Sequence, residues 1–426
     1  MYSLISWGRA AIAEFDWSKG KLPPLKAHSG AKLRLIEHYL NSYFDAVVKN
    51  PTIERLRITL VDGFCGGGAF DLDGARVDGT PFLLLQAVEN AEKRLNENKD
   101  KKLTIDAQFH FVDVEKSAID HLKHELFQRG YLSRIGKDIF LHNEMFENIV
   151  ESIQGSIAAR TRGGAGRSLF LLDQKGYTGV PLRAIRSIFK QFEKAECILT
   201  FAIDWLIGYI SERPEWAAGV TKLQLSPGQI KEILDLKNAK ATRYAIQHIL
   251  LDHIQQNTNA QFATPFFIRS QEAKKNLWLV HLSQHAKARN VMVDSHWAVK
   301  NHSIHQGYGG LEINGFDPRY DPANTPDFMF AEHERQIMHN RLQTDIARRL
   351  RDTYGHDPVH YGTFINAIAN ETPARLSDID QVISALAAER EIQIRNHNGN
   401  EKRVLKPALS DHIMINRQDR FSFHMR

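Results

Sequence analysis

The sequence predicts a doubly wound α/β domain with a mostly parallel sheet, followed by a smaller α+β domain. Short apolar runs alternate with amphipathic stretches over the first half of the chain, and three of these runs end in an aspartate. Strands that alternate with helices of about 10–15 residues are typical of a parallel, doubly wound sheet. The strand candidates are 58–62, 109–113, 139–142, 169–173 and 197–201.

The composition is that of an ordinary globular protein. The chain has 426 residues, of which 42% are hydrophobic and 25% are charged, and its formal net charge is +5. This charge permits an acidic partner such as nucleic acid but does not require one. Two cysteines are too few for a disulfide framework or a CxxC-type zinc site, and we expect no metal. At roughly 150 residues per domain, we expect two or three domains.

The sequence predicts a cytoplasmic protein that does not use a membrane. No apolar run approaches the roughly 20 residues that a membrane span requires. The first 15 residues lack a basic start followed by a long apolar core, so we predict no signal peptide. Residues 1–25 are expected to form an exposed N-terminal lead-in.

The elements that follow the lead-in form the first domain, residues 26–306. Its first helix is expected at 28–49, ahead of the first strand. The apolar runs 265–269 and 277–282 are expected to pair as a hairpin that closes the sheet. A helical insertion is expected at about 211–262, where the sequence becomes charged and helical.

The second domain, residues 328–426, resembles a winged helix. It follows a predicted linker at 307–327, which is rich in Gly, Pro, Asn and Asp. Two short helices are expected at 360–370 and 376–390, and a strand–turn–strand with a basic turn at 391–407. Many small α+β modules share this order of elements.

A glycine-rich turn follows the first predicted strand, in the sequence ITLVDGFCGGGAFD. Glycines let the backbone adopt positive φ and pass close to a ligand. A dinucleotide site needs G-x-G-x-x-G, but the sixth position counted from Gly66 is Asp71. The carboxylate of Asp62 would repel a pyrophosphate and favours a ligand with a cationic centre, such as S-adenosylmethionine. The alternative is a tight strand-to-helix turn that holds no ligand.

The spelling D-x-F-x-G-x-G resembles motif I of class I methyltransferases, which bind S-adenosylmethionine at this turn. The matching residues are Asp62, Phe64, Gly66 and Gly68. Shortly after the turn, Thr80-Pro81 predicts a helix that starts with a hydroxyl cap.

The second strand also ends in an acid, in FHFVDVEKSAI. An acid at this strand tip hydrogen-bonds ribose hydroxyls in related architectures, and we assign Asp113, with Glu115 in reserve. Asp113 follows Asp62 by 51 residues, more than the usual spacing of about 20, so we expect an insertion at 71–104. The alternative is a carboxylate that only caps the next helix.

The third strand is followed by LHNEMFENI, and the fourth by DQKGYTG. By resemblance to methyltransferases, Glu144 would contact adenine; the alternative is a solvated loop. Asp173 and Tyr177 match the acid and the aromatic ring of the D-P-P-Y turn of amino-methyltransferases, and we assign them the catalytic role. Gln174 replaces the first proline, which makes N-methylation of adenine or cytosine doubtful.

Three further observations bear on the chemistry of the site. Cys65 and Cys197 do not lie in a Pro-Cys turn, so a cytosine C5 mechanism with a thiolate is unsupported. The run LLDQK also fits the D-x-K pattern of metal-dependent nucleases. A nuclease interpretation, however, leaves the glycine turn unexplained. Lys32 lies four residues after His28 on the first helix and could pair with the carboxylate of the cofactor; the alternative is a solvated lysine.

Taken in order, these stretches resemble the three-Cys-motif partner (TcmP) family of bacterial and phage-associated proteins. The stretches are His28 with Lys32, VDGFCGGG, FVDVEKSAI, LFLLDQKGYTGVPL, ILTFAIDWL and PFFIRS…LWLVHLSQHAKARNVMVDSHW. The resemblance implies a Rossmann-like methyltransferase domain and, as a partner, a three-Cys-motif protein that resembles radical-SAM proteins. The family usually has Asp-Pro where this chain has Asp173-Gln174.

The basic turn of the second domain is the predicted nucleic-acid interface. Residues 391–426 hold seven Lys and Arg against four Asp and Glu. The cations around the turn are Arg395, Lys402, Arg403 and Lys406. Binding to a DNA or RNA backbone is one hypothesis, and a protein-binding winged helix is the other.

The function that we predict is S-adenosylmethionine-dependent methyl transfer to a nucleic acid or nucleotide-like substrate, together with a partner protein. One alternative is a non-catalytic sensor or scaffold that keeps the fold and acts through its winged helix. A metal-dependent nuclease is the third hypothesis.

Overall fold

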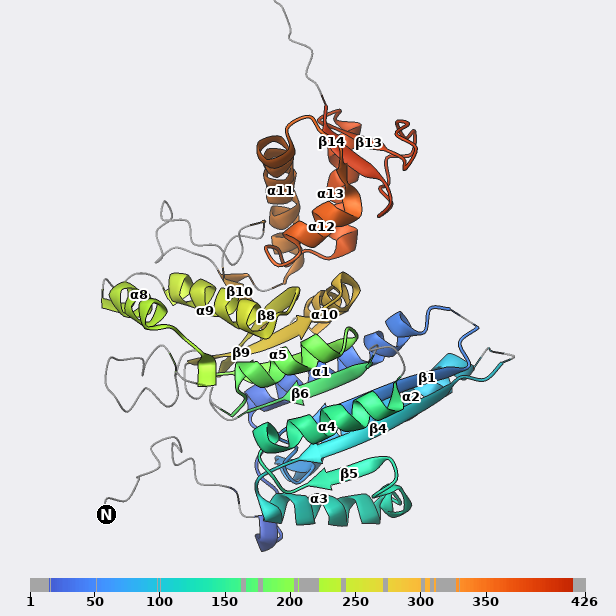
Figure 1. The fold of residues 1–426 in the computed structure, drawn as a ribbon, viewed down its shortest axis with the longest axis vertical. Helices are drawn as coiled ribbons and strands as arrows, with labels where there is room; N and C mark the ends of the chain where they lie inside the picture. Colours follow the sequence, from blue (N-terminus) through green and yellow to red (C-terminus); the bar gives the residue numbers. More distant parts are fainter. Residues whose placement is uncertain are drawn as a thin grey trace, which may run out of the picture. The chain divides into compact units, whose positions relative to one another are not determined.

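The chain folds into two compact units, Met1–Ser303 and Ile304–Arg426. The computed structural model describes residues 15, 17–50, 52–97, 99, 101–161, 166–174, 179–202, 206, 222–238, 243–270, 275–299, 303–306, 310–311, 327–328 and 330–416 (Figure 1). None of the helices in these ranges is both long enough and apolar enough for a membrane crossing.

The described part of the first unit contains seven strands of a mostly parallel sheet, in the order β8-β9-β7-β6-β1-β4-β5. Neighbouring strands from β7 to β5 pair in parallel, whereas β9 is antiparallel to both β7 and β8. The strands are β1 (Arg55–Asp62), β4 (Thr104–Val112), β5 (Ile139–His142), β6 (Ser168–Leu172), β7 (Ala195–Phe201), β8 (Phe262–Ser270) and β9 (Lys275–Ser283).

This sheet confirms the predicted doubly wound fold. From β1 the chain continues to β4 and β5 on one side, then crosses to β6 and β7 on the other. The strand order therefore reverses between β1 and β6. Open α/β sheets bind ligands at this switch point, outside the carboxyl ends of the strands.

Helices cover both faces of the sheet (Figure 1). Helix α1 packs against α2 and α10, and α5 packs against α4 and α9 on the opposite face. The helices are α1 (Ala27–Val47), α2 (Thr80–Asn96), α3 (Lys116–Gln128), α4 (Phe146–Arg160), α5 (Leu182–Gln191), α8 (Pro227–Asn238), α9 (Arg243–Thr258) and α10 (Ala286–Val299). Short 3-10 turns lie at η1 (Trp17–Lys19) and η2 (Leu132–Arg134).

The central strands form because their sequences suit burial on both faces. Every residue of β6 and β7 is buried, which is typical of parallel strands covered by helices on both sides. Helix α1 buries one apolar stripe against the sheet. The stripe consists of Leu35, Ile36, Tyr39, Leu40, Tyr43 and Phe44.

The long spacing between Asp62 and Asp113 has a simpler cause than the predicted insertion at 71–104. The inserted element is a β-hairpin, β2 (Ala69–Leu72) and β3 (Ala75–Asp78), placed between the glycine turn and α2. Helix α2 is the crossover helix that any parallel β1–β4 connection requires. The nine-residue strand β4 contributes the remaining length.

The second unit combines three helices with a small antiparallel sheet of order β12-β14-β13. Its elements are α11 (Glu332–Arg349), a π-helical turn (Leu350–Tyr354), β12 (Val359–His360), α12 (Tyr361–Ile368), α13 (Leu376–Ala388), β13 (Ile392–Arg395) and β14 (His412–Ile415). Two further strands, β10 (Ser303–Gln306) and β11 (Asp327–Phe328), pair antiparallel. The winged-helix assignment stays a prediction, and most of the predicted linker at 307–327 lies outside the described residues.

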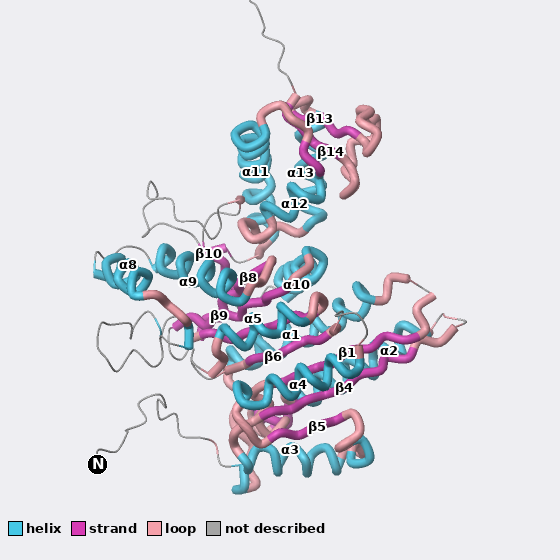
Figure 2. The backbone as a smooth tube through the Cα atoms, in the orientation of Figure 1, coloured by secondary structure: helices cyan, strands magenta, loops and turns pink. Residues whose placement is uncertain are grey.

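The predicted strand–turn–strand at 391–407 is wrong in its second strand. Only the bridge from Arg395 to Glu401 follows the turn, and β13 pairs with β14, which starts at His412. The carboxylate of Asp411 holds the intervening loop, because it accepts hydrogen bonds from the Ala408 N–H at 2.7 Å and from Lys402 Nζ at 2.6 Å. Figure 2 shows this long loop beside β13 and β14.

Candidate functional site

Three aspartates lie at the carboxyl ends of neighbouring strands. Asp62 ends β1, Asp113 follows β4, and Asp173 follows β6. The three strands are adjacent, and the charges of Asp113 and Asp173 both act on Asp62. The predicted acids therefore gather at the point where the strand order reverses.

Asp62 is the most buried member of this cluster, at 1% exposure. The Thr80 hydroxyl donates a hydrogen bond to its Oδ2, and the Phe64 N–H donates to its Oδ1 at 3.2 Å. Burial raises the pKa of Asp62 to about 7, although these hydrogen bonds oppose the shift. Removing the charged form from water is the dominant cause.

The predicted hydroxyl cap at Thr80 is wrong, because its hydroxyl bonds to Asp62. The N-cap of α2 is Gly79, which has no side chain to make a cap bond, while Pro81 stands in the first turn. Thr80 thus links the start of α2 to the end of β1.

The glycine turn is held in place by Asp113. Gly66 and Gly68 have φ values of +57° and +82°, which glycine adopts without steric cost. The Gly66 N–H donates to Asp113 Oδ2 at 2.9 Å, and the Glu115 N–H donates to Asp113 Oδ1 at 2.9 Å. Asp113 therefore joins the glycine turn to the start of α3, and its contact with a ribose stays a prediction.

Lys32 reaches from α1 to Asp173 at the end of β6. Its ammonium lies 2.6 Å from both carboxylate oxygens, and the two side chains are 10% and 40% exposed. Burial raises the pKa of Asp173, but the charge and hydrogen bonds of Lys32, with a hydrogen bond from Thr200, lower it by more. Asp173 is therefore ionised and paired, so the interpretation of Lys32 as a solvated lysine is wrong.

Gln174 stabilises the turn after β6. Its side-chain Oε1 accepts a hydrogen bond from the Val180 N–H at 2.9 Å, which identifies the other terminal atom as the amide nitrogen. That nitrogen is buried and has no hydrogen-bond partner among the residues that the structure describes. The predicted catalytic Tyr177 lies outside the described residues, with residues 175–178.

Glu144 lies at the start of α4 and is exposed. Its Oε1 accepts hydrogen bonds from the Met145 N–H at 2.8 Å and from Asn148 Nδ2 at 2.9 Å. The backbone bond from Met145 is the main cause of a lowered pKa. The carboxylate therefore stabilises the N-terminus of α4, and its contact with adenine stays a prediction.

Two observations on the described part of the chain bear on the alternative chemistries. No group of three or more His, Cys, Asp and Glu side chains arranged to hold a metal ion occurs there. Both cysteines are buried, and burial raises the pKa of the Cys65 and Cys197 thiols. Such thiols are poor nucleophiles near neutral pH.

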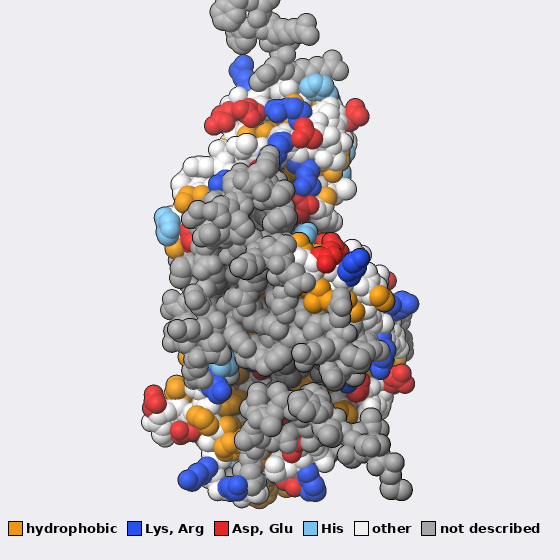
Figure 3. Space-filling model, turned by 90° about the vertical axis from the view of Figure 1, so that its left-hand side faces the viewer, with side chains coloured by type: hydrophobic (Ala, Val, Ile, Leu, Met, Phe, Trp, Pro, Cys, Tyr) orange, Lys and Arg blue, Asp and Glu red, His pale blue; other side chains and the backbone are white. Residues whose placement is uncertain are grey.

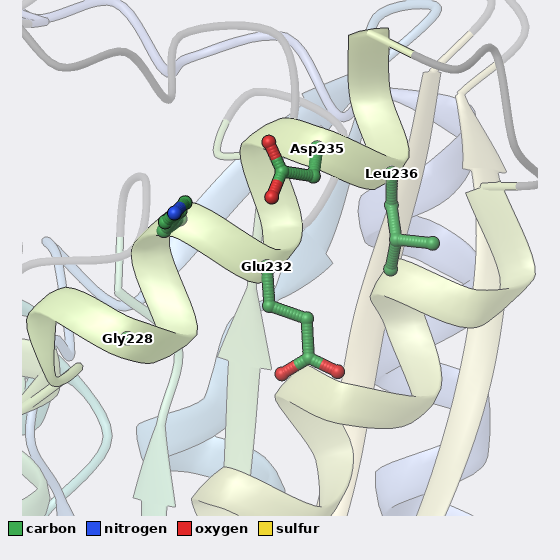
Figure 4. Close-up of a pocket in the computed structure, with 5 residues that line it drawn as sticks. Gly228, Glu232, Asp235 and Leu236 are labelled. Carbon is green, nitrogen blue, oxygen red and sulfur yellow. The ribbon is translucent and has the colours of Figure 1, made fainter.

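A surface hollow on α8 does not involve the aspartates. Its five lining residues are Gly228, Lys231, Glu232, Asp235 and Leu236, all from this one helix. In Figure 4 the carboxylates of Glu232 and Asp235 point to different sides and do not converge. We therefore assign this hollow no site.

The four predicted nucleic-acid contacts in the second unit have different surroundings. Arg395 donates from Nε to Gln393 Oε1 at 2.8 Å, and Lys402 pairs with the buried Asp411. Arg403 and Lys406 are exposed. The structure therefore leaves Arg403 and Lys406 accessible, whereas Lys402 fixes the loop.

No protein-family model and no curated protein matches the sequence. Solved structures that match include the bifunctional kinase-methyltransferase WbdD, with 12% identity and a TM-score of 0.31 over 60% of this chain and 39% of that one. The plantazolicin methyltransferase BamL matches with 9% identity and a TM-score of 0.25, over 60% and 86%. The O-methyltransferase TomG from Streptomyces achromogenes matches with 11% identity and a TM-score of 0.29, over 63% and 94%.

BamL was solved with S-adenosylhomocysteine and TomG with S-adenosylmethionine. The matched region is about two fifths of WbdD. At TM-scores this low, the assignment of the fold depends on the order and direction of the strands. These define a doubly wound, mostly parallel sheet.

Proposed function

We propose that the first unit binds S-adenosylmethionine and transfers its methyl group to an acceptor. The observation that carries this proposal is the juxtaposition of the glycine turn with Asp62 and Asp113 at the switch point of the sheet. When bound, the cofactor would supply a methyl group on a cationic sulfur. The feature of the residues present that fits such a group is the pair of carboxylates, Asp62 and Asp113, which a cation would attract.

The residues of this site would act by binding and orientation. Asp62 gains from a cationic neighbour, because such a charge stabilises its ionised form against burial. Asp113 keeps the glycine turn in one conformation, and Lys32 keeps Asp173 ionised beside the place where an acceptor would enter. Fixed groups of this kind accelerate a displacement by positioning the reactants and by presenting oriented charges. We keep the proposed roles of Phe64, Glu144 and Tyr177 as part of this hypothesis.

The nature of the acceptor and of the partner is a second part of the proposal. A nucleic acid or nucleotide-like acceptor is consistent with the resemblance to the three-Cys-motif partner family, and so is a radical-SAM-like protein partner. We also propose a cytoplasmic location.

The test combines calorimetry with a transfer assay. Titration of the full chain with S-adenosylmethionine in EDTA should give a Kd in the micromolar range, and Asp62→Asn should weaken it. Methyl transfer from radiolabelled cofactor to DNA, RNA and protein would then identify the acceptor. Absence of binding, together with Mg²⁺-dependent DNA cleavage that Asp173→Ala abolishes, would establish the nuclease hypothesis instead.

One observation favours the alternative function, in which the second unit binds a protein. Residues 304–426 carry fifteen Lys and Arg and seventeen Asp and Glu, and α13 contains no Lys or Arg. A nucleic-acid-binding domain normally presents a basic face. In the view of Figure 3, acidic and basic side chains of the described residues are interspersed. A cofactor-binding protein that transfers no methyl group to any acceptor would support this scaffold function.

A further inference from the structure

The segment from Trp17 to Leu25, which we call the strap, contacts the hairpin that follows the glycine turn. The Leu25 N–H donates to the Asp71 carbonyl at 2.6 Å, and the Asp71 N–H donates to the Pro23 carbonyl at 2.8 Å. A parallel bridge joins Pro24 to Asp71. The strap thus joins the β2–β3 hairpin through a single β-bridge. Within the predicted exposed lead-in, residues 18–21 are exposed, whereas Trp17 is buried.

The other end of the strap lies on the glycine turn itself. Trp17 is buried, and a Cβ atom built on Gly67 would overlap carbons of its indole ring. The ring therefore occupies the space that any side chain at position 67 would need. His121 from α3 completes the contact, because its ring centroid lies 5.0 Å from that of Trp17 and its Nδ1 lies 2.8 Å from the Gly67 carbonyl oxygen.

Three consecutive glycines need such support. Glycine loses more conformational freedom on folding than other residues, and a loop of three has many accessible shapes. Several contacts restrict this loop. The carboxylate of Asp113 binds the Gly66 N–H, and the Trp17 ring covers Gly67. The carbonyl oxygens of Gly67 and Gly68 lie within hydrogen-bond distance of His121 Nδ1 and the Gly79 N–H. A binding loop that is ordered before the ligand arrives avoids an ordering cost at binding.

We propose that the strap preorganises the glycine turn for the cofactor and that Trp17 is its positioning residue. This inference rests on the proposed function, because it names S-adenosylmethionine as the ligand whose affinity depends on Trp17. Trp17 itself touches the loop and is not a catalytic residue. Its effect is transmitted through Gly67.

The first experiment tests the strap without any ligand. The strap and its flank contain three trypsin sites, after Lys19, Lys21 and Lys26. In the full chain, Trp17→Ala should speed cleavage at these sites by about tenfold, because the anchored conformation is lost. Trp17→Phe keeps an aromatic ring over Gly67 and should cleave at nearly the wild-type rate. Equal rates for wild type and Trp17→Ala would overturn the anchoring role.

The second experiment measures cofactor affinity in a double-mutant cycle. Gly67→Ala places a methyl group where the ring lies, so it should displace the ring and raise the Kd by about tenfold, as Trp17→Ala does. The double variant should be no weaker than either single variant, because both changes disrupt the same contact. Gly155→Ala in α4 is the control, since a Cβ there meets no atom within 4 Å.

The two experiments separate the inference from the proposed function. If the losses of cofactor affinity in the two single variants multiply in the double variant, the two changes act independently and the inference is contradicted. Single variants that bind the cofactor like wild type would also contradict it. A wild-type chain that does not bind S-adenosylmethionine would refute the proposed function and the ligand-dependent part of the inference. The proteolysis result would still decide whether Trp17 anchors the strap.

Discussion

The ammonium of Lys32 lies 2.6 Å from both carboxylate oxygens of Asp173, although 141 residues separate them in the sequence. This pair connects α1 to the end of β6 beside the switch point. Lys32 therefore pairs with a carboxylate of the protein itself, whereas its predicted partner is the carboxylate of the cofactor. The net charge that remains at the site comes from Asp62 and Asp113, which suits a cationic ligand.

The first prediction is that breaking this pair costs stability. Lys32→Met leaves Asp173 ionised and partly buried without its partner, and we expect the free energy of unfolding to fall by about 1–3 kcal/mol. Lys116→Met is the matched control, because the Lys116–Asp120 pair is 76% and 58% exposed. Lys116→Met should lower the free energy of unfolding by no more than about 0.5 kcal/mol. Equal losses in urea denaturation would show that the buried pair contributes no more than a surface pair.

The second prediction concerns the dependence of stability on pH. The pKa of Asp62 is about 7 in the folded chain, well above the value of about 4 expected on unfolding. The folded state therefore binds this proton more tightly, and the stabilisation is present below pH 4 and lost as the pH rises through 7. The free energy of unfolding of wild type, relative to Asp62→Asn, should fall over this window by up to about 4 kcal/mol. A constant difference from pH 4 to 8 contradicts the raised pKa.

The third prediction links the same group to the proposed cofactor. A cation is attracted to the ionised form of Asp62, so the affinity for S-adenosylmethionine should rise between pH 6 and pH 8. The rise should approach about tenfold per pH unit at its steepest, since one proton is released on binding. Calorimetry of Asp62→Asn should give a flat profile over this range. The hypothesis fails if wild type and variant show the same profile.

The strand pattern of the first unit could be predicted from sequence, because buried parallel strands are continuous apolar runs. The acids at the strand ends could be placed too, since the carboxyl ends of parallel strands meet at one edge. Thr80 was the instructive error: its hydroxyl precedes a proline at a helix start, which favours a cap. The Thr80 hydroxyl instead bonds to Asp62, because a buried carboxylate needs hydrogen-bond donors. Asp62 is buried only in the folded chain, so the local sequence does not indicate this bond.

The long-range contacts of the site had no local sequence signal. The pairing of Lys32 with Asp173 depends on how α1 crosses the sheet, which periodicity does not specify. The position of Trp17 over Gly67 also joins distant segments. The strand at 412–415 was missed because the turn residues after Arg395 favour a tight hairpin, whereas Asp411 and Lys402 stabilise a longer loop.

The fourth prediction distinguishes the cations of the second unit. Lys402 is 22% exposed and its partner Asp411 is 5% exposed, so Lys402→Ala should destabilise the loop between β13 and β14. Arg403→Ala and Lys406→Ala should leave the thermal midpoint unchanged. If this loop contacts phosphates, each of these two variants lowers the salt dependence of DNA binding by about one unit of slope. Identical binding isotherms for wild type and both variants would exclude this loop as the nucleic-acid interface.

The fifth prediction compares two buried glutamines that differ in how well they are hydrogen-bonded. Gln174 accepts one bond from the Val180 N–H, and its amide nitrogen has no partner in the described part of the chain. Gln108 Oε1, in contrast, accepts hydrogen bonds from both Ser156 and Arg160. Methionine has nearly the volume of glutamine and no polar atoms. Gln174→Met therefore loses one hydrogen bond but removes an unsatisfied donor, and the two effects of about 1–3 kcal/mol each should nearly cancel.

Gln108→Met offers no such compensation, because it removes an acceptor that a charged Arg160 uses. We expect Gln174→Met to change the free energy of unfolding by less than about 1 kcal/mol and Gln108→Met to lower it by about 2 kcal/mol or more. The comparison is made by urea denaturation of both variants under the same conditions. A loss at Gln174 as large as that at Gln108 would mean that its amide nitrogen has a partner in solution. Water or a ligand at the turn after β6 would then be the group to identify.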